Sequence, residues 1–366
     1  MKITYLINSF SAGGKERQLF YLLKSLAKEN SIQLIIFSEE VFYEEIYNLP
    51  IQIIKIATDK KYSLESVKSI YNKIKDFTPE IIHSWYNIGT LLIFPYLLFN
   101  ISVPLISSIR YAGKIKKTHK SLLIKFISHI RSSAIVSNSK HGLKVEKLQS
   151  SRKGITIYNG IDIKQFNTNL KNTNRSSSKI EDFENKVVML ASFSPAKDFV
   201  TFVKVAQKVY QQNKDTCFIY IGDGPYRPLA EKEAVDYLNK NIFFLGKRNN
   251  IPSILNNMDI GVLLNNTNGH AEGISNAIME YMAAELPVIA TNAGGTPELV
   301  QNNISGFLIP AFDVNVVAEK ILYLKNNQNR ARKMGKAGRK IIEKDFSIKQ
   351  MTESYLNLYE RLIHEK

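Results

Sequence analysis

One stretch of the chain decides the fold, GHAEGISNAIMEYMAAELPVIATNAGGTPELV at residues 269–300. Its pattern predicts a loop, a helix, a short buried strand, a glycine-rich loop and a second helix. Ser275 is a typical N-cap for a helix that ends near Ala284, and Pro297 stands at the start of the next helix. Two helix N-termini beside one parallel strand, residues 288–290, present unpaired N–H groups, an arrangement that binds phosphate.

Two acidic residues in this stretch lie in different predicted elements, one in a loop and one in a helix. Glu272 lies in the loop before the first helix, and Glu280 lies inside that helix. A carboxylate on the helix can accept hydrogen bonds from both hydroxyls of a ribose, and a carboxylate in the loop can reach a group that the phosphates carry. The alternative is that Glu280 and Glu285 are solvated helix charges. The glycine-rich loop that follows favours the ligand-binding interpretation.

The spacing of these residues resembles the signature of a known family, the retaining GT-B glycosyltransferases of family 4, or glycosyl transferases group 1, of which many act in surface-polysaccharide biosynthesis. Paired glutamates with a trailing Gly-Gly are far more specific than a lone glycine motif. The resemblance extends over nearly the whole chain. It implies an α/β fold with two Rossmann-like, doubly wound parallel-sheet domains that face a central cleft. The residues that carry it are Glu272, Gly273, Ile274, Ser275, Asn276, Glu280, residues 287–291, Gly294, Gly295 and Glu298.

The composition is that of a globular and strongly basic protein. With 366 residues, 44% of them hydrophobic, the chain can form two domains with separate cores. Its single cysteine, Cys217, excludes an internal disulfide and lies in an apolar run, so we expect it in a core. The first apolar run, residues 1–7, is too short for a signal peptide, which favours the cytoplasm.

The formal charge of +16 predicts an anionic partner, such as a nucleic acid, a membrane surface or a phosphorylated substrate. No helix-turn-helix, zinc-finger or RNA-binding signature is present, which disfavours nucleic acid.

Apolar runs alternate with helical stretches, and this order predicts a parallel sheet in each half of the chain. A polar, Asn- and Ser-rich segment, residues 167–183, predicts a linker. We expect an N-terminal acceptor domain at residues 1–166 and a C-terminal nucleotide-sugar donor domain at residues 184–347. The resemblance implies that the last helix, residues 348–366, completes the first domain. The predicted strands are residues 3–7, 32–37, 51–56, 81–83, 105–109 and 134–137, then 187–191, 217–221 and 258–264.

In the first half, polar and glycine residues follow the predicted strands. Gly13-Gly14 would allow a ligand to approach the backbone, and they resemble the family loop that faces the sugar diphosphate and the acceptor. His83 ends a strand, and the family has a histidine near this place that contacts the transferred sugar. Many members read His-x-His where this chain has Trp85, so a structural role for His83 is the alternative. Arg110 could pair with an anionic acceptor or a phosphate.

In the second half, Lys197 begins a helix after a strand and matches the family lysine that reaches the diphosphate. This chain has Ser192 where the family usually has an arginine, and Lys247 or Arg248 could compensate. The resemblance thus assigns catalytic roles to Glu272, Lys197 and His83, and donor contacts to Gly13, Gly14, Gly222, Gly246, Gly273, Ile274, Ser275, Asn276, Glu280, Gly294 and Gly295.

Two stretches raise the question of a membrane. Residues 89–109 carry no charge, but Pro95 and Pro104 interrupt them, so we expect a buried helix followed by a buried strand. Residues 114–131, from Lys114 to Arg131, interleave bulky apolar residues with cations and contain no acid. That pattern is typical of a helix on an anionic membrane surface. The alternative is a domain helix with a solvated basic face.

The predicted activity is transfer of a sugar from a nucleotide diphosphate sugar, a UDP-sugar, to an acceptor hydroxyl on a lipid-linked or membrane-proximal glycan. We expect no metal or other cofactor, because the chain has no Asp-x-Asp pair. Lys197 and the amides around Gly294-Gly295 would stabilise the leaving diphosphate. Peripheral attachment to the inner face of the membrane would fit this acceptor.

Three other interpretations are open. One is a sugar-nucleotide epimerase with the same fold, which would need no acceptor. Another is a non-enzymatic basic protein that binds polyanions, which would leave the paired glutamates without a role. A dinucleotide oxidoreductase is disfavoured, because no G-x-G-x-x-G follows a strand.

Overall fold

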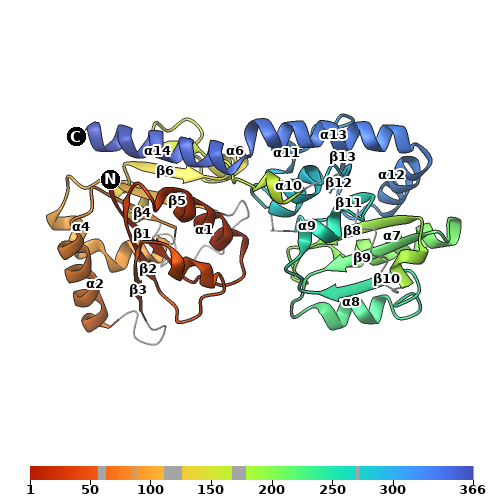
Figure 1. Ribbon diagram of the computed structural model, residues 1–366, viewed down its shortest axis with the longest axis horizontal. Helices are drawn as coiled ribbons and strands as arrows, with labels where there is room; N and C mark the ends of the chain where they lie inside the picture. Colours follow the sequence, from red (N-terminus) through yellow and green to blue (C-terminus); the bar gives the residue numbers. More distant parts are fainter. Residues whose placement is uncertain (57–62, 86, 111–125, 167–178, 269–271, 366) are drawn as a thin grey trace. The chain divides into compact units, whose positions relative to one another are not determined.

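The computed structural model describes residues 1–56, 63–85, 87–110, 126–166, 179–268 and 272–365 (Figure 1). These residues form two compact units. Unit 1 contains the described residues up to Gly160 together with the last helix, which begins at Ile348. Unit 2 contains the described residues from Ile161 to Ser347.

The boundary between the units differs from the prediction, which placed it after residue 166. Residues 161–166 belong to unit 2 because the Ile161 amide donates to the Phe346 carbonyl at 2.9 Å, and Arg339 donates to the Phe166 carbonyl at 2.7 Å. Most of the predicted linker lies outside the described residues. Its last part forms the 3-10 turn η3, Lys179–Asp182.

Unit 1 is built on a parallel sheet with the strand order β3-β2-β1-β4-β5-β6-β7. The six predicted strands of this half are confirmed, with ends that differ from the prediction by two residues at most. The short strand β7 was not predicted as a strand. The strands are β1 Lys2–Ile7, β2 Ser31–Ile36, β3 Gln52–Lys55, β4 Ile81–Ser84, β5 Leu105–Ile109, β6 Ala134–Ser137 and β7 Gly154–Thr156.

Two groups of helices cover the two faces of this sheet. Successive strand residues point to opposite faces, so Tyr5 and Leu34 pack with one helix group while Leu6 and Ile35 pack with the other. The first group is α1, Gly14–Leu26, and α14, Ile348–His364; the second is α2, Leu64–Phe77, α3, Asn87–Leu92, and α4, Phe94–Phe99. The 3-10 turn η1, Glu44–Asn48, and helix α6, Lys140–Val145, complete the described elements of unit 1.

Unit 2 has a second parallel sheet, with the order β10-β9-β8-β11-β12-β13. Its strands are β8 Asn185–Leu190, β9 Thr216–Ile221, β10 Ile242–Gly246, β11 Ile260–Leu263, β12 Val288–Thr291 and β13 Gly306–Ile309. Its helices are α7 Phe199–Gln212, α8 Arg227–Glu233, α9 Ile251–Leu255, α10 Asn276–Ala283, α11 Thr296–Leu299, α12 Val314–Asn326 and α13 Gln328–Asp345, with the 3-10 turn η2 Ile163–Gln165.

Each sheet contains a point where the strand order reverses. In unit 1 this point lies between β1 and β4, and in unit 2 it lies between β8 and β11. The connections leave these neighbouring strands in opposite directions, and open α/β sheets bind ligands beyond the carboxyl ends of strands at such points. The loops that follow these strands are therefore the expected ligand-binding loops.

The charge-free run at residues 89–109 differs in detail from the prediction. It forms two short helices, α3 and α4, before strand β5, and not one buried helix. The end of α4 is not buried, since Leu98 and Phe99 are exposed. In the part of the chain that the structure describes, no helix combines the length and apolarity needed to cross a bilayer.

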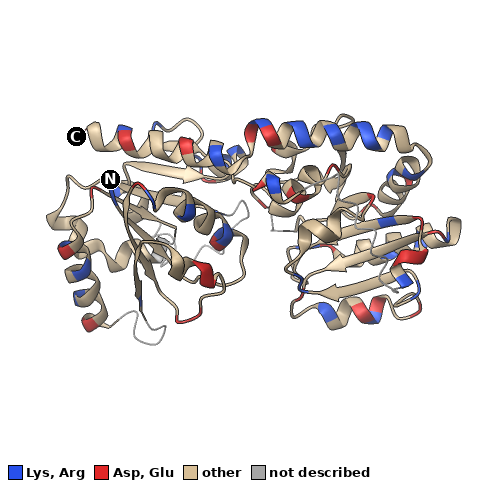
Figure 2. Cartoon of the chain, in the orientation of Figure 1, with Lys and Arg blue, Asp and Glu red and all other residues tan. Residues whose placement is uncertain are grey.

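Part of the basic charge lies on one helix of unit 2. Lys and Arg residues recur along helix α13 (Figure 2). Cys217 is buried in strand β9, as predicted, and burial raises the pKa of its thiol to about 12.

Candidate active site

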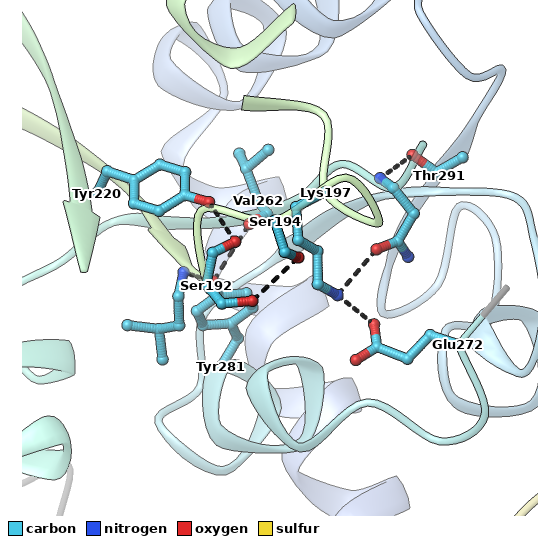
Figure 3. A network of polar contacts seen from close by, with 10 residues as sticks. Ser192, Ser194, Lys197, Tyr220, Val262, Glu272, Tyr281 and Thr291 are labelled. Carbon is cyan, nitrogen blue, oxygen red and sulfur yellow. Dashed lines mark hydrogen bonds and ion pairs between the residues drawn. The ribbon is translucent and has the colours of Figure 1, made fainter. Parts of the chain in front are cut away.

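Lys197, Glu272 and Asn265 meet at the carboxyl edge of the unit 2 sheet (Figure 3). The Lys197 ammonium donates to Glu272 Oε2 at 2.6 Å and to Asn265 Oδ1 at 2.9 Å. The Lys197 side chain is 12% exposed and that of Glu272 is 35% exposed. The carboxylate is therefore open to solvent on one side, whereas the ammonium is largely surrounded by protein.

Backbone contacts hold this group at the reversal point between β8 and β11. Lys197 and Asn265 form an antiparallel bridge between the loops that follow these two strands. The Asp198 amide donates to the Leu264 carbonyl at 2.9 Å, and the Asn265 amide donates to Thr291 Oγ1 at 3.0 Å. Asp198 also caps helix α7. Lys197 thus lies between a strand end and a helix start, both of which are fixed.

The glycine-rich loop packs directly on the backbone of the Glu272 loop. Gly294 has a φ of +60°, and a Cβ there would lie 2.1 Å from the Glu272 carbonyl oxygen. A Cβ on Gly295 would lie 2.6 Å from the Gly273 carbonyl oxygen. Only glycine permits this approach, so the Gly-Gly pair sets the position of Glu272.

The Gly295 amide makes a hydrogen bond within the site, because it donates to the Glu272 carbonyl at 2.9 Å. Helix α11, which follows the glycine-rich loop, has only four residues. In this structure the loop positions Glu272, and the contact between the diphosphate and the amides around Gly294-Gly295 stays a prediction.

Helix α10 carries Glu280 and begins after Ser275, as predicted. Ser275 occupies the N-cap position, but its side chain makes no capping hydrogen bond. Glu280 is only 6% exposed, so the alternative of a solvated helix charge is wrong for this residue. Next to it, the Tyr281 hydroxyl accepts from the Leu190 amide at 2.5 Å and donates to the Val262 carbonyl at 3.2 Å. These bonds tie α10 to strands β8 and β11.

The other residues assigned to the donor in unit 2 also lie at strand ends. Gly222 has a φ of +146°, and a Cβ there would lie 1.8 Å from the Ala191 carbonyl oxygen, so this turn too requires glycine. Gly246 ends β10 with a φ of +68°. Gly273 and Ile274 are buried before α10, and Asn276 is the first residue of that helix.

A cation that the sequence analysis missed lies near Gly246. Nη1 of Arg227 is 3.4 Å from the place where a Gly246 Cβ would stand, and Arg227 also pairs with Glu231 at 2.8 Å. Lys247 and Arg248, which were to compensate for Ser192, are exposed in the loop after β10. Arg227 begins a helix after a strand end, which is the signal that identified Lys197, so the sequence could have revealed it.

In unit 1, His83 is fully buried, and both of its ring nitrogens have partners. Nδ1 lies 2.7 Å from the Tyr359 hydroxyl and accepts from Trp85 Nε1 at 3.3 Å, while Nε2 lies 2.8 Å from Ser108 Oγ. An Nδ1 that accepts from an indole carries no proton, so the proton is on Nε2. Burial, with the charge of Arg110, holds the pKa of His83 well below its usual value. This geometry favours the structural alternative for His83.

The remaining candidates of unit 1 gather where β1, β4 and β5 end. Arg110 stacks on Trp85, with Cζ 3.5 Å from the ring centroid, and donates to the Tyr355 hydroxyl at 2.5 Å. Gly13 is the N-cap of α1, and Gly14 is the first residue of that helix. Lys15 follows them and was not singled out by the sequence analysis.

Groups of three or more His, Cys, Asp or Glu that could hold a metal ion are absent from the described residues. The predicted membrane stretch, residues 114–131, lies outside the described residues up to residue 125. Its last six residues, 126–131, are helical.

Comparisons with known proteins place these sites in a family. Residues 171–341, which contain Lys197, Glu272 and Glu280, match the model of a family described as glycosyl transferases group 1. This match covers a little under half of the chain, and it lies in unit 2. The two parallel sheets of the chain form the α/β fold known as GT-B, and each unit is Rossmann-like.

Individual relatives are similar over part of their length. The N-acetyl-alpha-D-glucosaminyl L-malate synthase of Bacillus anthracis is 25% identical over 241 residues, which are 65% of this chain and 61% of that protein. The UDP-Gal:alpha-D-GlcNAc-diphosphoundecaprenol alpha-1,3-galactosyltransferase of Escherichia coli is 28% identical over 57% of this chain and 54% of that protein. The chain thus spans little more than half the length of these curated relatives.

A solved structure is similar over 99% of this chain. Anabaena Alr3699/HepE, in complex with UDP and glucose, superposes with a TM-score of 0.85 over 99% of this chain and 100% of that chain, at 18% identity. At this level of identity, the likeness establishes the fold.

Proposed function

We propose that this protein is a glycosyltransferase that moves a sugar from a nucleotide diphosphate sugar, a UDP-sugar, to an acceptor hydroxyl. One observation carries the proposal: within the region that matches the family, Lys197 and Glu272 meet at the reversal point of the unit 2 sheet. An ammonium at such an edge is suited to a diphosphate. The complex of Anabaena Alr3699/HepE with UDP supports the choice of nucleotide.

The reaction breaks the bond between the sugar C1 and a diphosphate oxygen, and forms a bond between C1 and the acceptor oxygen. Negative charge develops on the leaving diphosphate as the first bond breaks. Lys197, held by Asn265 and Glu272, supplies a positive charge that is already in place, so little reorganisation is needed during the reaction. The stabilisation comes from this chain's own cations, which makes the proposed transfer metal-independent.

The configuration at C1 is retained in the proposed reaction. The acceptor attacks from the face that the diphosphate leaves, and its proton passes to a diphosphate oxygen. Glu272 then has the role of binding donor sugar hydroxyls, which suits a carboxylate that is partly open to solvent. We assign it no covalent bond to the sugar.

Nucleotide binding tests the proposal directly, because Glu280 is assigned to the ribose hydroxyls. Glu280→Ala should weaken UDP binding by about tenfold or more, since two hydrogen bonds to a carboxylate are lost. Calorimetric titrations with UDP, GDP and ADP would measure this and identify the base that is preferred. Glu285→Ala, at the partly exposed residue after the same helix, is the matched control. Equal UDP affinity in the wild type and in Glu280→Ala would exclude this site.

We also propose that the acceptor is a lipid-linked or membrane-proximal glycan of surface-polysaccharide synthesis. The name of the Escherichia coli relative gives its acceptor as a GlcNAc-diphosphoundecaprenol, which is a lipid-linked sugar. In unit 1, exposed apolar side chains gather at one place. Arg131 Nη2 donates to the carbonyls of Asn100 and Ile101 at 3.2 Å, and so joins the helical residues 126–131 to the turn after α4. The exposed apolar residues there are Leu98, Phe99, Ile101, Phe126 and Ile130.

This apolar patch, defined by those five residues, is suited to the interface of an anionic membrane. Phe99 is 79% exposed and Ile101 is 77% exposed, while Arg131 and Lys153 lie beside the patch and contact backbone carbonyls in or near it. Bulky apolar groups with flanking cations bind anionic lipid by burial together with charge attraction. Docking through the patch would keep the protein on the inner face of the membrane, in the cytoplasm.

Liposome flotation tests the patch. The double variant Phe99→Ser/Ile101→Ser should lose most binding to vesicles of phosphatidylglycerol, because each buried aromatic or aliphatic side chain contributes about 1.5–3 kcal/mol. Leu64→Ser is the matched control, since Leu64 is an exposed apolar residue at the start of α2, outside the patch. Equal flotation of the double variant and the wild type, or no preference for phosphatidylglycerol over phosphatidylcholine, would contradict the proposal.

A further inference from the structure

Arg110 is surrounded by neutral groups at the carboxyl edge of the unit 1 sheet. Its Nη2 donates to the Tyr355 hydroxyl, its Nη1 donates to Asn159 Oδ1 at 3.3 Å, and the guanidinium stacks on Trp85. Its Nε is buried without a hydrogen-bond partner. No carboxylate among the described residues forms an ion pair with it, and residues 111–131, which follow it, contain no Asp or Glu.

A second cation, Lys15, lies at the same carboxyl edge of the unit 1 sheet, in the first turn of the helix that follows β1. The Lys15 ammonium donates to Asn8 Oδ1 and lies 3.5 Å from Glu16 Oε1, which also accepts from Ser9 Oγ at 3.2 Å. Burial lowers the pKa of Lys15, Glu16 opposes this effect, and Arg110 lowers the pKa further. The cluster thus contains two cations and the single carboxylate of Glu16.

His83, which lies under Trp85 and Tyr355, adds no compensating charge. Burial and the nearby Arg110 hold its pKa well below its usual value, so the ring is neutral. A charge that is withdrawn from water without an opposite charge raises the free energy of the folded state, and an incoming anion lowers it again. The positive charge at this edge therefore exceeds what the described residues of the cluster neutralise.

The geometry of Arg110 is suited to a particular type of anion. A guanidinium has five N–H donors in one plane, and two of those on Arg110 are bonded to neutral oxygens. Stacking on Trp85 fixes the plane, so the charge and its donors keep one orientation. A planar fork with a fixed orientation matches the oxygens of a carboxylate or a phosphate.

We propose that Lys15 and Arg110 form an anion-binding site for the acceptor, and that the acceptor of this enzyme carries a phosphate or carboxylate group. That the bound anion is the acceptor rests on the proposed glycosyl transfer. The existence of an anion site does not. Both cations lie in unit 1, beyond the ends of β1 and β5, and flank the reversal point between β1 and β4. Trp85, Asn159 and Tyr355 are positioning residues for Arg110.

Calorimetric titration with inorganic phosphate, and separately with succinate, tests the site in the full chain. The titrations are made with UDP at saturation, so that the phosphate does not occupy the donor site in unit 2. Lys15→Gln and Arg110→Gln should each weaken phosphate or succinate binding by about tenfold, the loss expected for a hydrogen bond to a charged group. Arg110→Lys should recover part of the affinity, because it keeps the charge but loses the planar fork.

Two matched controls separate this site from general charge effects. Lys24→Gln removes a cation from the last turn of the same helix as Lys15, and Arg361→Gln removes an exposed arginine from α14. Both should bind phosphate as the wild type does. The Lys15 side chain is 24% exposed and lies in the first turn of α1, so Lys15→Gln tests the site even if Arg110→Gln fails to fold.

The outcomes show whether the two cations bind an anionic acceptor or the diphosphate of the donor. Weaker phosphate or succinate binding in Lys15→Gln and Arg110→Gln, with unchanged UDP affinity, supports an anionic acceptor. An equal loss of UDP affinity would show that the two cations hold the donor diphosphate, and would overturn the inference. Binding of neither anion to the wild type, or unchanged binding of both anions in the variants, would also overturn it. If the wild type does not bind UDP, the proposed function fails, and phosphate titration without UDP, with Lys197→Gln as reference, still decides the anion site.

Discussion

Lys197→Ala is expected to lower the rate of sugar transfer by about 100- to 1000-fold, the usual loss when one preorganised group that stabilises developing charge is removed. The ammonium is 12% exposed and held by Glu272 and Asn265, so water cannot easily replace it. The measurement is the kcat for donor consumption with UDP-sugars, together with UDP affinity. The rate should fall more than the affinity, because the charge on the diphosphate increases as the bond to C1 breaks.

A neighbouring lysine provides the control for this prediction. Lys204 lies on the helix that Lys197 precedes, and it pairs with Glu233 at 3.9 Å on the surface. Lys204→Ala removes the same charge and also breaks an ion pair, but it should leave the rate unchanged. If Lys197→Ala retained the wild-type rate, the proposed mechanism would be wrong even if the nucleotide still bound.

Gly294→Ala should destabilise unit 2 and displace Glu272 from Lys197. The left-handed backbone alone, with a φ of +60°, costs about 1–3 kcal/mol for a residue with a Cβ. In addition, the Cβ would lie 2.1 Å from the Glu272 carbonyl oxygen, so one of the two loops must move. We expect a lower Tm and a transfer rate close to that of Glu272→Ala.

Gly246→Ala separates the two causes of this loss. Gly246 has a similar φ of +68°, but a Cβ there would meet only the flexible Arg227 side chain at 3.4 Å. This variant should show the cost of the backbone conformation without that of the collision. If Gly294→Ala and Gly246→Ala had the same Tm, the collision with the Glu272 carbonyl would add nothing to the cost of the backbone conformation. The close packing of the glycine-rich loop on the Glu272 loop would then not contribute to stability.

The elements of both sheets could be predicted because their signals are local. Apolar runs between turn residues identified six strands in unit 1. The misses have local causes too. The strand β7 has only three residues, and α4 ends in apolar side chains that face solvent, which an apolar run alone cannot indicate.

The candidate site was only partly predictable. Lys197 and Glu272 were each identified by a local motif, but their ion pair was not, because 75 positions separate them. The Gly294-Gly295 pair was assigned to phosphate binding from the sequence, but its packing on the Glu272 loop was not foreseen, since the sequence does not reveal which carbonyl an amide will meet. His83 illustrates the same limit, because three of its partners, Ser108, Tyr359 and Trp85, come from three different segments.

The sequence by itself determined the two parallel sheets, the resemblance to a known family, and the residues that lie at strand ends. Periodicity, glycines and helix starts act over a few residues, so they can be recognised without coordinates. Only the tertiary structure decided which strand ends are neighbours. It placed Lys197 against Glu272, buried His83 under Trp85 and Tyr355, and brought Lys15 and Arg110 to the same edge of the unit 1 sheet. Charge and burial depend on neighbours in space, and parallel strands acquire those neighbours only when the sheet forms.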